Sequence, residues 1–529
     1  MDNTEKAGKS AKPGQIGSSE QQTLTLQQAL DLAVQHHSNG NLPEANRIYQ
    51  QILQTHPNQP MALHLLGLIS HQVGKNDRAI DLITKALDIK PDYAEAHCNL
   101  GNAQKDLGNL DEAIASYRKA LAIYPGFVEA YYNLGIAFKE LGRMEEAVAN
   151  YQKALDIEPN HAKANNNLGG VLQSLGNLEE AVSSYHKAIT IKPDFAEAHN
   201  NLGNVQKEMG QLDEAVASYQ EALDINPGYA EAYSNLGNSL QGLGKLEEAV
   251  ANYHKALAIK SDLAEAHNNL GSALADLGKL NEAVASFSKV FAINPNYAEA
   301  HYNLGTALLG LGRLDDAVIH YHKAIAIKPD YAEAHGNLGL TLQALGQLEE
   351  ALASYREALA IRPDYVPAGR NLLLGLLYLP GLSQEELFTE HLRFSENHTR
   401  DISRSAELTN EPTPDRRLRV GYLSSDFWDH PVGRNILPLL SSHDRTNFEV
   451  HCYAEVRRPD AITERFQACV DHWHTIIGKS DTDVVRMIRA DEIDVLVCLA
   501  GRFDKNRPLG CAHRAAPVQV SYHDGATSG

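Results

Sequence analysis

The sequence predicts an α-solenoid followed by part of an α/β lobe, and two observations lead to this fold class. First, asparagine recurs every 34 residues, at Asn99, Asn133, Asn167, Asn201, Asn235, Asn269, Asn303, Asn337 and Asn371. A fixed period of this length indicates one helical hairpin stacked many times. Second, the period ends near Pro380, and short β-rich runs that alternate with helical stretches begin at Arg419.

These patterns divide the chain of 529 residues into four segments. Residues 1–23 are polar and lack an apolar core, so we expect a disordered tail and not a secretory signal. Residues 24–378 are predicted to form about ten repeats and a capping helix. Residues 379–415 are predicted to be a linker with a short helix, in which Ser383 and Glu386 have the spacing of a capping box. Residues 416–529 are predicted to form an incomplete α/β lobe.

Three further columns define each repeat. Glycine stands between the two helices of every unit, from Gly40 to Gly346, where a positive φ can end a helix. A small alanine follows it and allows the two helices to approach closely. Proline closes each unit except one, where Ser261 takes its place. Together these columns resemble the tetratricopeptide repeat, which implies a right-handed superhelix with a concave inner wall.

The segment after Arg419 has a different pattern. Strands are predicted at residues 419–424, 448–454, 494–500 and 517–522. Helices are predicted between them at residues 435–442, 461–471 and 482–490. Strands that alternate with helices indicate a parallel sheet of Rossmann type.

Composition narrows the class of partner. The net charge is −20, and residues 416–529 hold 15 basic and 15 acidic residues, so the acidic excess lies in residues 1–415. An acidic array repels phosphates, so we expect polypeptide partners and no nucleic acid. The longest apolar run, residues 372–379, is too short to cross a membrane. Five cysteines without a CxxC pair are expected to be unpaired thiols, which favours a cytoplasmic protein.

The nine asparagines form a ladder that is a candidate for peptide binding. A primary amide has two donors and an acceptor, which match the C=O and N–H groups of an extended polypeptide. The alternative is a structural role in holding helix ends. A neighbouring column, in which His97 and other histidines alternate with Tyr131, is expected to pack between helices and not to bind metal.

The loop at residues 424–434 is the candidate site of the lobe. It leaves the carboxyl end of the first predicted strand, the edge at which open α/β sheets bind ligands. It presents Asp426, His430 and Arg434, and histidine is suited to proton transfer or phosphate contact. A purely structural loop is the alternative. No dinucleotide or ATP-binding glycine motif follows this strand, and Asp481 and Asp483 are expected to cap the helix at residues 484–490.

Four segments of the lobe resemble, in order, the opening of the catalytic region of the O-linked N-acetylglucosamine transferase and SPINDLY-like family. They read RRLRVGYLSSDFWDHPVG, FEVHCYAEVRRPDAITERF, IDVLVCLAG and RAAPVQVSYHDGATSG. The resemblance implies two facing Rossmann-like lobes (GT-B) that transfer a sugar from a nucleotide-sugar to Ser or Thr without a metal. It also implies that the superhelix delivers polypeptide substrates, that the asparagine ladder grips their backbone, and that His430 is an active-site contact. Thr527, Ser528 and Gly529 match a segment that lines the cleft.

Two departures from the family pattern concern the donor. Residues 501–503 read GRF where the family has GHT, and His523 and Asp524 replace a Gly-Tyr region. The second lobe, which supplies most donor contacts in the family, is expected to be missing from these 529 residues. UDP-GlcNAc is the expected donor, with GDP-fucose of the SPINDLY type as an alternative. A non-catalytic repeat scaffold is the alternative function.

Overall fold

A computed structural model describes residues 25–399, 410, 413, 415–499 and 514–522. The predicted tail at residues 1–23 and the predicted cleft residues Thr527, Ser528 and Gly529 lie outside the described residues. The chain divides into two compact units, residues 1–261 and 262–529.

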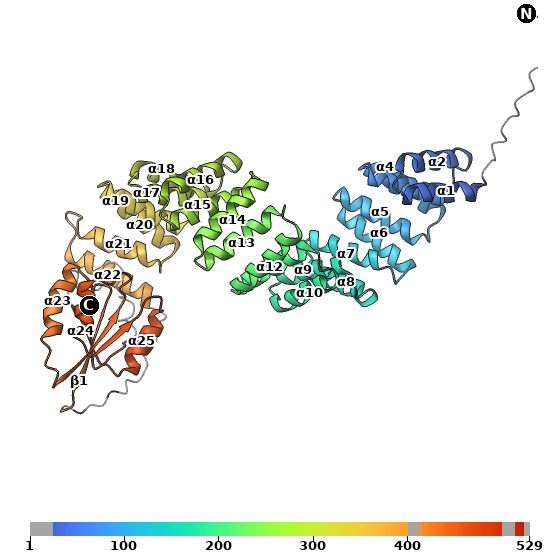
Figure 1. Cartoon of the computed structure of the whole chain (residues 1–529). Coiled ribbons are helices and arrows are strands. Elements are labelled where there is room, and N and C mark those ends of the chain that lie inside the picture. Colours follow the sequence, from blue (N-terminus) through green and yellow to red (C-terminus); the bar gives the residue numbers. More distant parts are fainter. Residues whose placement is uncertain (1–24, 400–409, 411–412, 414, 500–513, 523–529) are drawn as a thin grey trace, which may run out of the picture. The chain divides into compact units, whose positions relative to one another are not determined.

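The first unit consists of antiparallel helical hairpins, which Figure 1 draws in blue to green. Its helices are α1 (Leu26–Ser38), α2 (Leu42–Thr55), α3 (Pro60–Gln72), α4 (Asn76–Ile89), α5 (Ala94–Asp106), α6 (Leu110–Ile123), α7 (Val128–Glu140), α8 (Met144–Ile157), α9 (Ala162–Ser174), α10 (Leu178–Ile191), α11 (Ala196–Glu208), α12 (Leu212–Ile225), α13 (Ala230–Gly242) and α14 (Leu246–Ile259).

The second unit continues the same hairpins and then adds the lobe. Its helices before the lobe are α15 (Ala264–Asp276), α16 (Leu280–Ile293), α17 (Ala298–Gly310), α18 (Leu314–Ile327), α19 (Ala332–Ala344), α20 (Leu348–Ile361), α21 (Val366–Leu376) and α22 (Gln384–Thr399). The capping box predicted for α22 is confirmed, because Glu386 N–H donates to Ser383 Oγ at 3.2 Å and Ser383 N–H donates to Glu386 Oε2 at 2.8 Å.

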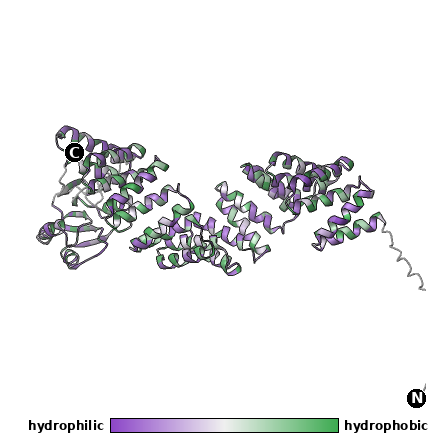
Figure 2. Ribbon diagram, turned by 90° about the horizontal axis from the view of Figure 1, so that it is seen from above, coloured by the Kyte–Doolittle hydropathy of each residue, from purple (hydrophilic) through white to green (hydrophobic). Residues whose placement is uncertain are grey.

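The repeat columns have the roles that their chemistry predicts. Gly108 has a φ of 81°, as expected of a glycine that ends one helix and starts the turn to the next. Gly101 lies against the ring of Tyr117, where an added Cβ would be 2.6 Å from Tyr117 Cε1. Ala113 and Tyr117 have no exposed surface. The helices of the repeats have an apolar side and a hydrophilic side. Figure 2 shows hydrophobic residues in green and hydrophilic residues in purple along these helices.

The lobe is a five-stranded parallel sheet with the strand order β3-β2-β1-β4-β5. Its elements are β1 (Leu418–Ser424), α23 (Pro431–Ser441), β2 (Phe448–Ala454), α24 (Ala461–Ala468), β3 (His472–Thr475), α25 (Asp481–Ala490), β4 (Val495–Leu499) and β5 (Val518–Tyr522). Helices α23 and α24 cover one face of the sheet and α25 covers the other, as Figure 1 shows. The predicted Rossmann-type topology is therefore confirmed.

Several local predictions for the lobe need correction. Strand β3 was not predicted, because its sequence HWHT carries two histidines and no run of apolar residues. Helix α23 begins at Pro431 and not at residue 435, since proline suits the first turn of a helix. Helix α25 is capped by Ser480, whose side chain accepts from Asp483 N–H, so Asp481 and Asp483 lie in its first turn.

Two further expectations concern thiols and membranes. Cys98, Cys452 and Cys469 are free thiols, as expected. Cys498 is disulfide-bonded, so the expectation of unpaired thiols is wrong for that residue. Among the described residues, no helix combines the length and apolar character needed to span a membrane.

Candidate functional site

The loop between β1 and α23 is held in one shape by backbone contacts. A Cβ on Gly433 would lie 2.5 Å from the carbonyl oxygen of Asp426 and 2.4 Å from that of Trp428, so only glycine fits there. The hydroxyl of Thr463 donates to the Phe427 carbonyl at 2.8 Å, which ties the loop to α24. The loop is therefore a fixed part of the lobe at the carboxyl end of β1.

His430 is the N-cap of α23. Its Nδ1 accepts from Val432 N–H at 3.3 Å and lies 3.9 Å from Asp426 Oδ1. Because Nδ1 accepts, the proton of the neutral imidazole is on Nε2, which is then a donor. The side chain is 35% exposed, so a ligand can reach it. This arrangement suits hydrogen bonding to a ligand oxygen.

Asp426 and Arg434 occupy different environments. Asp426 is buried, and its Oδ1 accepts from Ser425 Oγ at 3.1 Å. Arg434 is exposed and its Nε donates to Asp429 Oδ1 at 2.7 Å, and this hydrogen bond lowers the pKa of Asp429. The structure thus brings Asp426 and His430 together and pairs Arg434 with Asp429. A cleft role for Arg434 stays a prediction.

A pocket of about 490 Å³ opens at the carboxyl ends of β1 and β2. Its lining residues are Ser425, Asp426, Trp428, Glu455, Val456, Arg457 and Arg458. Arg457 and Arg458 are exposed and were not predicted as site residues. Their sequence signal is their position directly after β2, because parallel strands end at one edge of the sheet. Two guanidinium groups at the edge of this pocket favour an anion such as a diphosphate.

The asparagine ladder bonds between neighbouring repeats. In several repeats the amide nitrogen donates to the side chain that lies 35 residues earlier: Asn201 to Asn166 at 3.1 Å, Asn235 to Asn200 at 3.1 Å, Asn303 to Asn268 at 3.0 Å, and Asn167 and Asn337 to the hydroxyls of Tyr132 and Tyr302 at 3.2 Å. Asn99 lies 2.8 Å from His64 Nε2 in the same way. Sequence reasoning missed this second column of partners, because its residue type varies.

Several ladder amides make a further bond: Asn167 and Asn269 accept from the preceding asparagine at 3.4 and 3.3 Å, and Asn337 also lies 3.4 Å from Thr306 Oγ1. A primary amide has two N–H groups and a carbonyl oxygen, and the bond to the previous repeat uses one N–H. Most ladder residues are half-buried, but Asn133 is 6% exposed and therefore a poor contact for a peptide. The ladder has a structural role between repeats, and peptide binding by it stays a prediction.

The histidine column packs as predicted. The Nε2 atoms of His97, His199 and His335 lie 2.9, 3.0 and 3.1 Å from the carbonyl oxygens of Pro91, Pro193 and Pro329. Each such histidine thereby satisfies the carbonyl of the proline that closes the preceding repeat. This contact explains why proline and histidine recur together.

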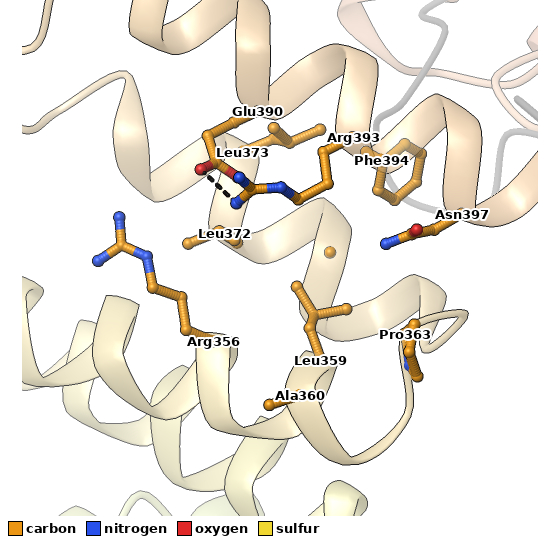
Figure 3. A pocket seen from close by; sticks show the side chains of 11 residues that line it. Arg356, Leu359, Ala360, Pro363, Leu372, Leu373, Glu390, Arg393, Phe394 and Asn397 are labelled. Atoms are coloured by element: carbon orange, nitrogen blue, oxygen red, sulfur yellow. Dashed lines mark hydrogen bonds and ion pairs between the residues drawn. The ribbon is translucent and has the colours of Figure 1, made fainter.

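A second, more apolar pocket lies between α20, α21 and α22. It has a volume of about 310 Å³ and is lined by Leu359, Leu372, Leu373 and Phe394, with the ion pair of Arg393 and Glu390 at its rim (Figure 3). None of the predicted site residues lines this pocket.

Comparison with known proteins assigns both parts of the chain. Residues 398–529 match glycosyl transferase family 41, and tetratricopeptide repeat families together match residues 69–364. The tomato protein named probable UDP-N-acetylglucosamine–peptide N-acetylglucosaminyltransferase SPINDLY is 32% identical over 154 residues, which cover 28% of this chain and 16% of that protein. Its Arabidopsis thaliana namesake is 34% identical over 154 residues, which cover 28% of this chain and 17% of that protein.

Two further matches concern another plant protein and a solved structure. The Arabidopsis thaliana protein of the same enzyme name, called SEC, is 34% identical over 108 residues, covering 20% of this chain and 11% of that protein. A solved structure of a Thermobaculum terrenum O-GlcNAc transferase mutant aligns over 49% of this chain and 50% of that chain, at 32% identity and a TM-score of 0.42. The chain spans about one sixth of the length of the SPINDLY relatives.

Proposed function

Because the chain joins tetratricopeptide repeats to a glycosyl transferase family 41 segment, we propose that it is part of a protein O-glycosyltransferase. The reaction transfers a sugar from a nucleotide-sugar to Ser or Thr hydroxyls of polypeptides that the repeats recruit. The observation that carries this proposal is the family match over residues 398–529, which contain the pocket lined by Asp426, the residue 3.9 Å from His430. The chain covers 16% of its tomato relative, so the activity is proposed for the full protein.

The proposed roles follow from the geometry of the sheet edge. The Nε2–H of His430 hydrogen-bonds to an oxygen of the donor or of the acceptor hydroxyl. Arg457 and Arg458 attract the diphosphate, since guanidinium groups pair with phosphate oxygens. The ladder amides hold the acceptor backbone, and Thr527, Ser528 and Gly529 line the cleft. UDP-GlcNAc is the proposed donor, following the names of the relatives, and GDP-fucose is the alternative. The cytoplasmic location stays a prediction.

The decisive experiment is a transfer assay on the natural full-length protein with radiolabelled UDP-GlcNAc and GDP-fucose in parallel. We expect one donor to label co-expressed protein substrates. The variant His430→Ala should lower kcat/KM by about 100-fold, because it removes a hydrogen bond near the reacting atoms. The matched control is His443→Asn, which removes an imidazole from the same lobe outside the pocket.

A second pair of variants tests the donor contact. Arg457→Ala with Arg458→Ala should raise the KM for the nucleotide-sugar about tenfold, and Arg465→Ala on α24 should leave it unchanged. If neither sugar is transferred while peptides still bind, the scaffold alternative replaces the proposed function.

A further inference from the structure

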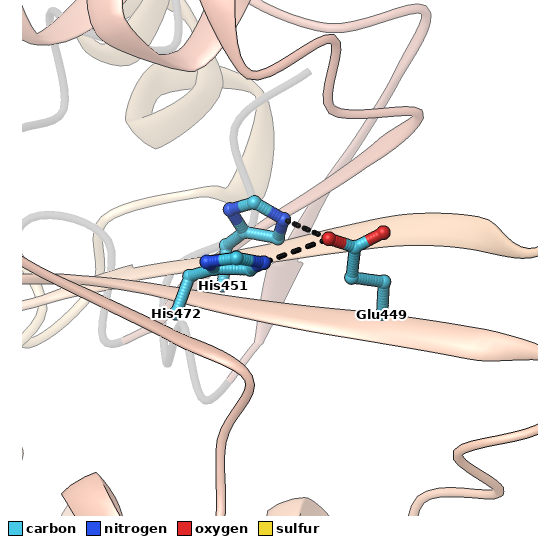
Figure 4. Close-up of side chains that lie close together, drawn as sticks. All are labelled: Glu449, His451 and His472. Carbon is cyan, nitrogen blue, oxygen red and sulfur yellow. Dashed lines mark hydrogen bonds and ion pairs between the residues drawn. The ribbon is translucent and has the colours of Figure 1, made fainter.

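A group of histidines and carboxylates lies on one face of β2 and β3. The register pairs His451 with His472 and Tyr453 with His474. Because side chains alternate along a strand, Glu449 and His451 of β2 share this face with His472 and His474 of β3. Figure 4 shows Glu449, His451 and His472 turned toward one another. None of the roles proposed above for sugar transfer uses these residues.

Three atoms of this group converge. Glu449 Oε1 lies 2.8 Å from His472 Nε2 and 3.5 Å from His451 Nε2, and the three atoms lie within 4.8 Å of one another. A tetrahedral zinc ion with bonds of about 2.0–2.1 Å separates its ligand atoms by about 3.3 Å. The two distances from Glu449 Oε1, 2.8 and 3.5 Å, lie on either side of that spacing.

His451 carries the independent observation that points to a ligand. It is 5% exposed, and its Nε2 makes no hydrogen bond, since Glu449 Oε1 at 3.5 Å is in ion-pair range only. A buried imidazole nitrogen that makes no hydrogen bond is costly in free energy, and such a group in a folded protein calls for an explanation such as a bound ion. A metal ion between His451, Glu449 and His472 would satisfy that nitrogen.

A second set of contacts orients His451 through its other ring nitrogen, Nδ1. Its Nδ1 lies 3.4 Å from His474 Nε2, which lies 3.3 Å from Asp491 Oδ2. The hydroxyl of Tyr453 donates to the same Asp491 oxygen at 2.6 Å. Histidines that bind metals commonly donate their other ring N–H to a fixed acceptor, and this orients the ring. His474 Nε2 can be that acceptor in the tautomer that has its proton on Nδ1, and Asp491 Oδ2 is then held by the hydroxyl of Tyr453.

We propose that Glu449, His451 and His472 bind a divalent transition metal of the zinc type. The His472 side chain is 48% exposed, which allows metal entry and leaves a fourth coordination position open to water. The family resemblance implies that sugar transfer needs no metal. That expectation concerns the donor cleft and not this group of histidines. Glu449 is six residues before the pocket residue Glu455, or about 20 Å along an extended strand. The metal therefore has a structural role, joining the four-residue edge strand β3 to β2.

The proposal is tested by metal titration of the full-length protein after removal of metals with a chelator. We expect one Zn²⁺ per chain at this site and a tetrahedral Co²⁺ absorption band when Co²⁺ replaces it. His451→Ala and His472→Ala should each weaken Zn²⁺ binding at least 100-fold. His474→Ala should weaken it about 10- to 100-fold, because it removes an orienting partner and not a ligand. His443→Asn should bind as the wild type does.

The exposed residue His472 makes the test independent of folding. His472→Ala should keep the wild-type circular dichroism and melting temperature in chelator, yet lose the rise in melting temperature that Zn²⁺ gives the wild type. The proposal is overturned if His472→Ala binds Zn²⁺ as tightly as the wild type. It is also overturned if His451→Ala binds Zn²⁺ as tightly as the wild type. Full loss in Asp491→Asn with normal binding in His472→Ala would place the metal on the other side of His451 and also overturn it. None of these outcomes depends on sugar transfer.

Discussion

The repeats and the lobe are stabilised by contacts of different range. In the repeats, a residue such as Tyr117 packs against Gly101 within its own hairpin, and the ladder bonds reach only the neighbouring repeat. In the lobe, β1 pairs with β4 across more than 70 residues of sequence, as the pairing of Val420 with Val495 shows. Neighbouring repeats of the solenoid are therefore expected to unfold locally, whereas the lobe is expected to unfold as one cooperative unit. Both tryptophans, Trp428 and Trp473, lie in the lobe, so tryptophan fluorescence reports on the lobe alone.

The largest expected effect comes from Gly433→Ala. The new Cβ would meet two backbone carbonyl oxygens at 2.4 and 2.5 Å, which cannot move without deforming the loop after β1. We expect the lobe to lose about 2–3 kcal/mol, measured by denaturant unfolding followed by tryptophan fluorescence. The control Gly170→Ala on α9 places its Cβ 3.6 Å from the nearest atom, Tyr185 OH, and should leave the tryptophan transition unchanged. An equal midpoint for both variants would contradict this view of the loop.

The next effect is a pH dependence of the stability of the lobe. Burial opposes ionisation of Asp494, but hydrogen bonds from Arg416, the Arg419 N–H and Asn410 outweigh it and lower its pKa. A lowered pKa in the folded state stabilises the lobe above the unfolded pKa of about 3.9, and this contribution is lost as the pH falls through the folded value. The tryptophan-reported stability should therefore fall below about pH 4.

Asp494→Asn tests this assignment. The variant should be less stable than the wild type at pH 7 and should lose less of its stability between pH 5 and pH 3. Asp429→Asn is the control, because Asp429 is exposed beside Arg434 and its pairing is screened by solvent. A wild-type pH profile in Asp494→Asn would assign the acid sensitivity to other carboxylates.

The smallest effect separates the two roles of the ladder. Asn235→Ala and Asn200→Ala each remove the same bond between repeats, so each should destabilise the helices by about 1 kcal/mol, measured by circular dichroism. Only Asn235→Ala removes a ladder amide. If the ladder binds peptides, Asn235→Ala should weaken peptide binding more than Asn200→Ala does. Equal peptide binding by the two variants would leave the ladder with a structural role only.

Much of the candidate site was visible in the sequence, and the reason is the position of the loop after β1. Asp426 and His430 were predicted together and lie 3.9 Å apart, because both belong to one short loop. Arg457 and Arg458 were missed, since they follow β2 and reach the same pocket only through the parallel register of β1 and β2. Arg434 was predicted to act together with Asp426 and His430. Its Nε donates instead to the exposed carboxylate of Asp429.

Periodicity alone sufficed for the repeats. Hairpins from α1 to α20, their turns at glycine and their buried alanines all follow from contacts that recur every 34 residues, so the sequence displays them directly. Three-dimensional packing was needed wherever partners are distant in sequence. The strand β3, the acceptors of the ladder asparagines and the meeting of Glu449 with His472 leave no local pattern. Each depends on which strand or repeat lies alongside, and side chains become neighbours only after that pairing is made.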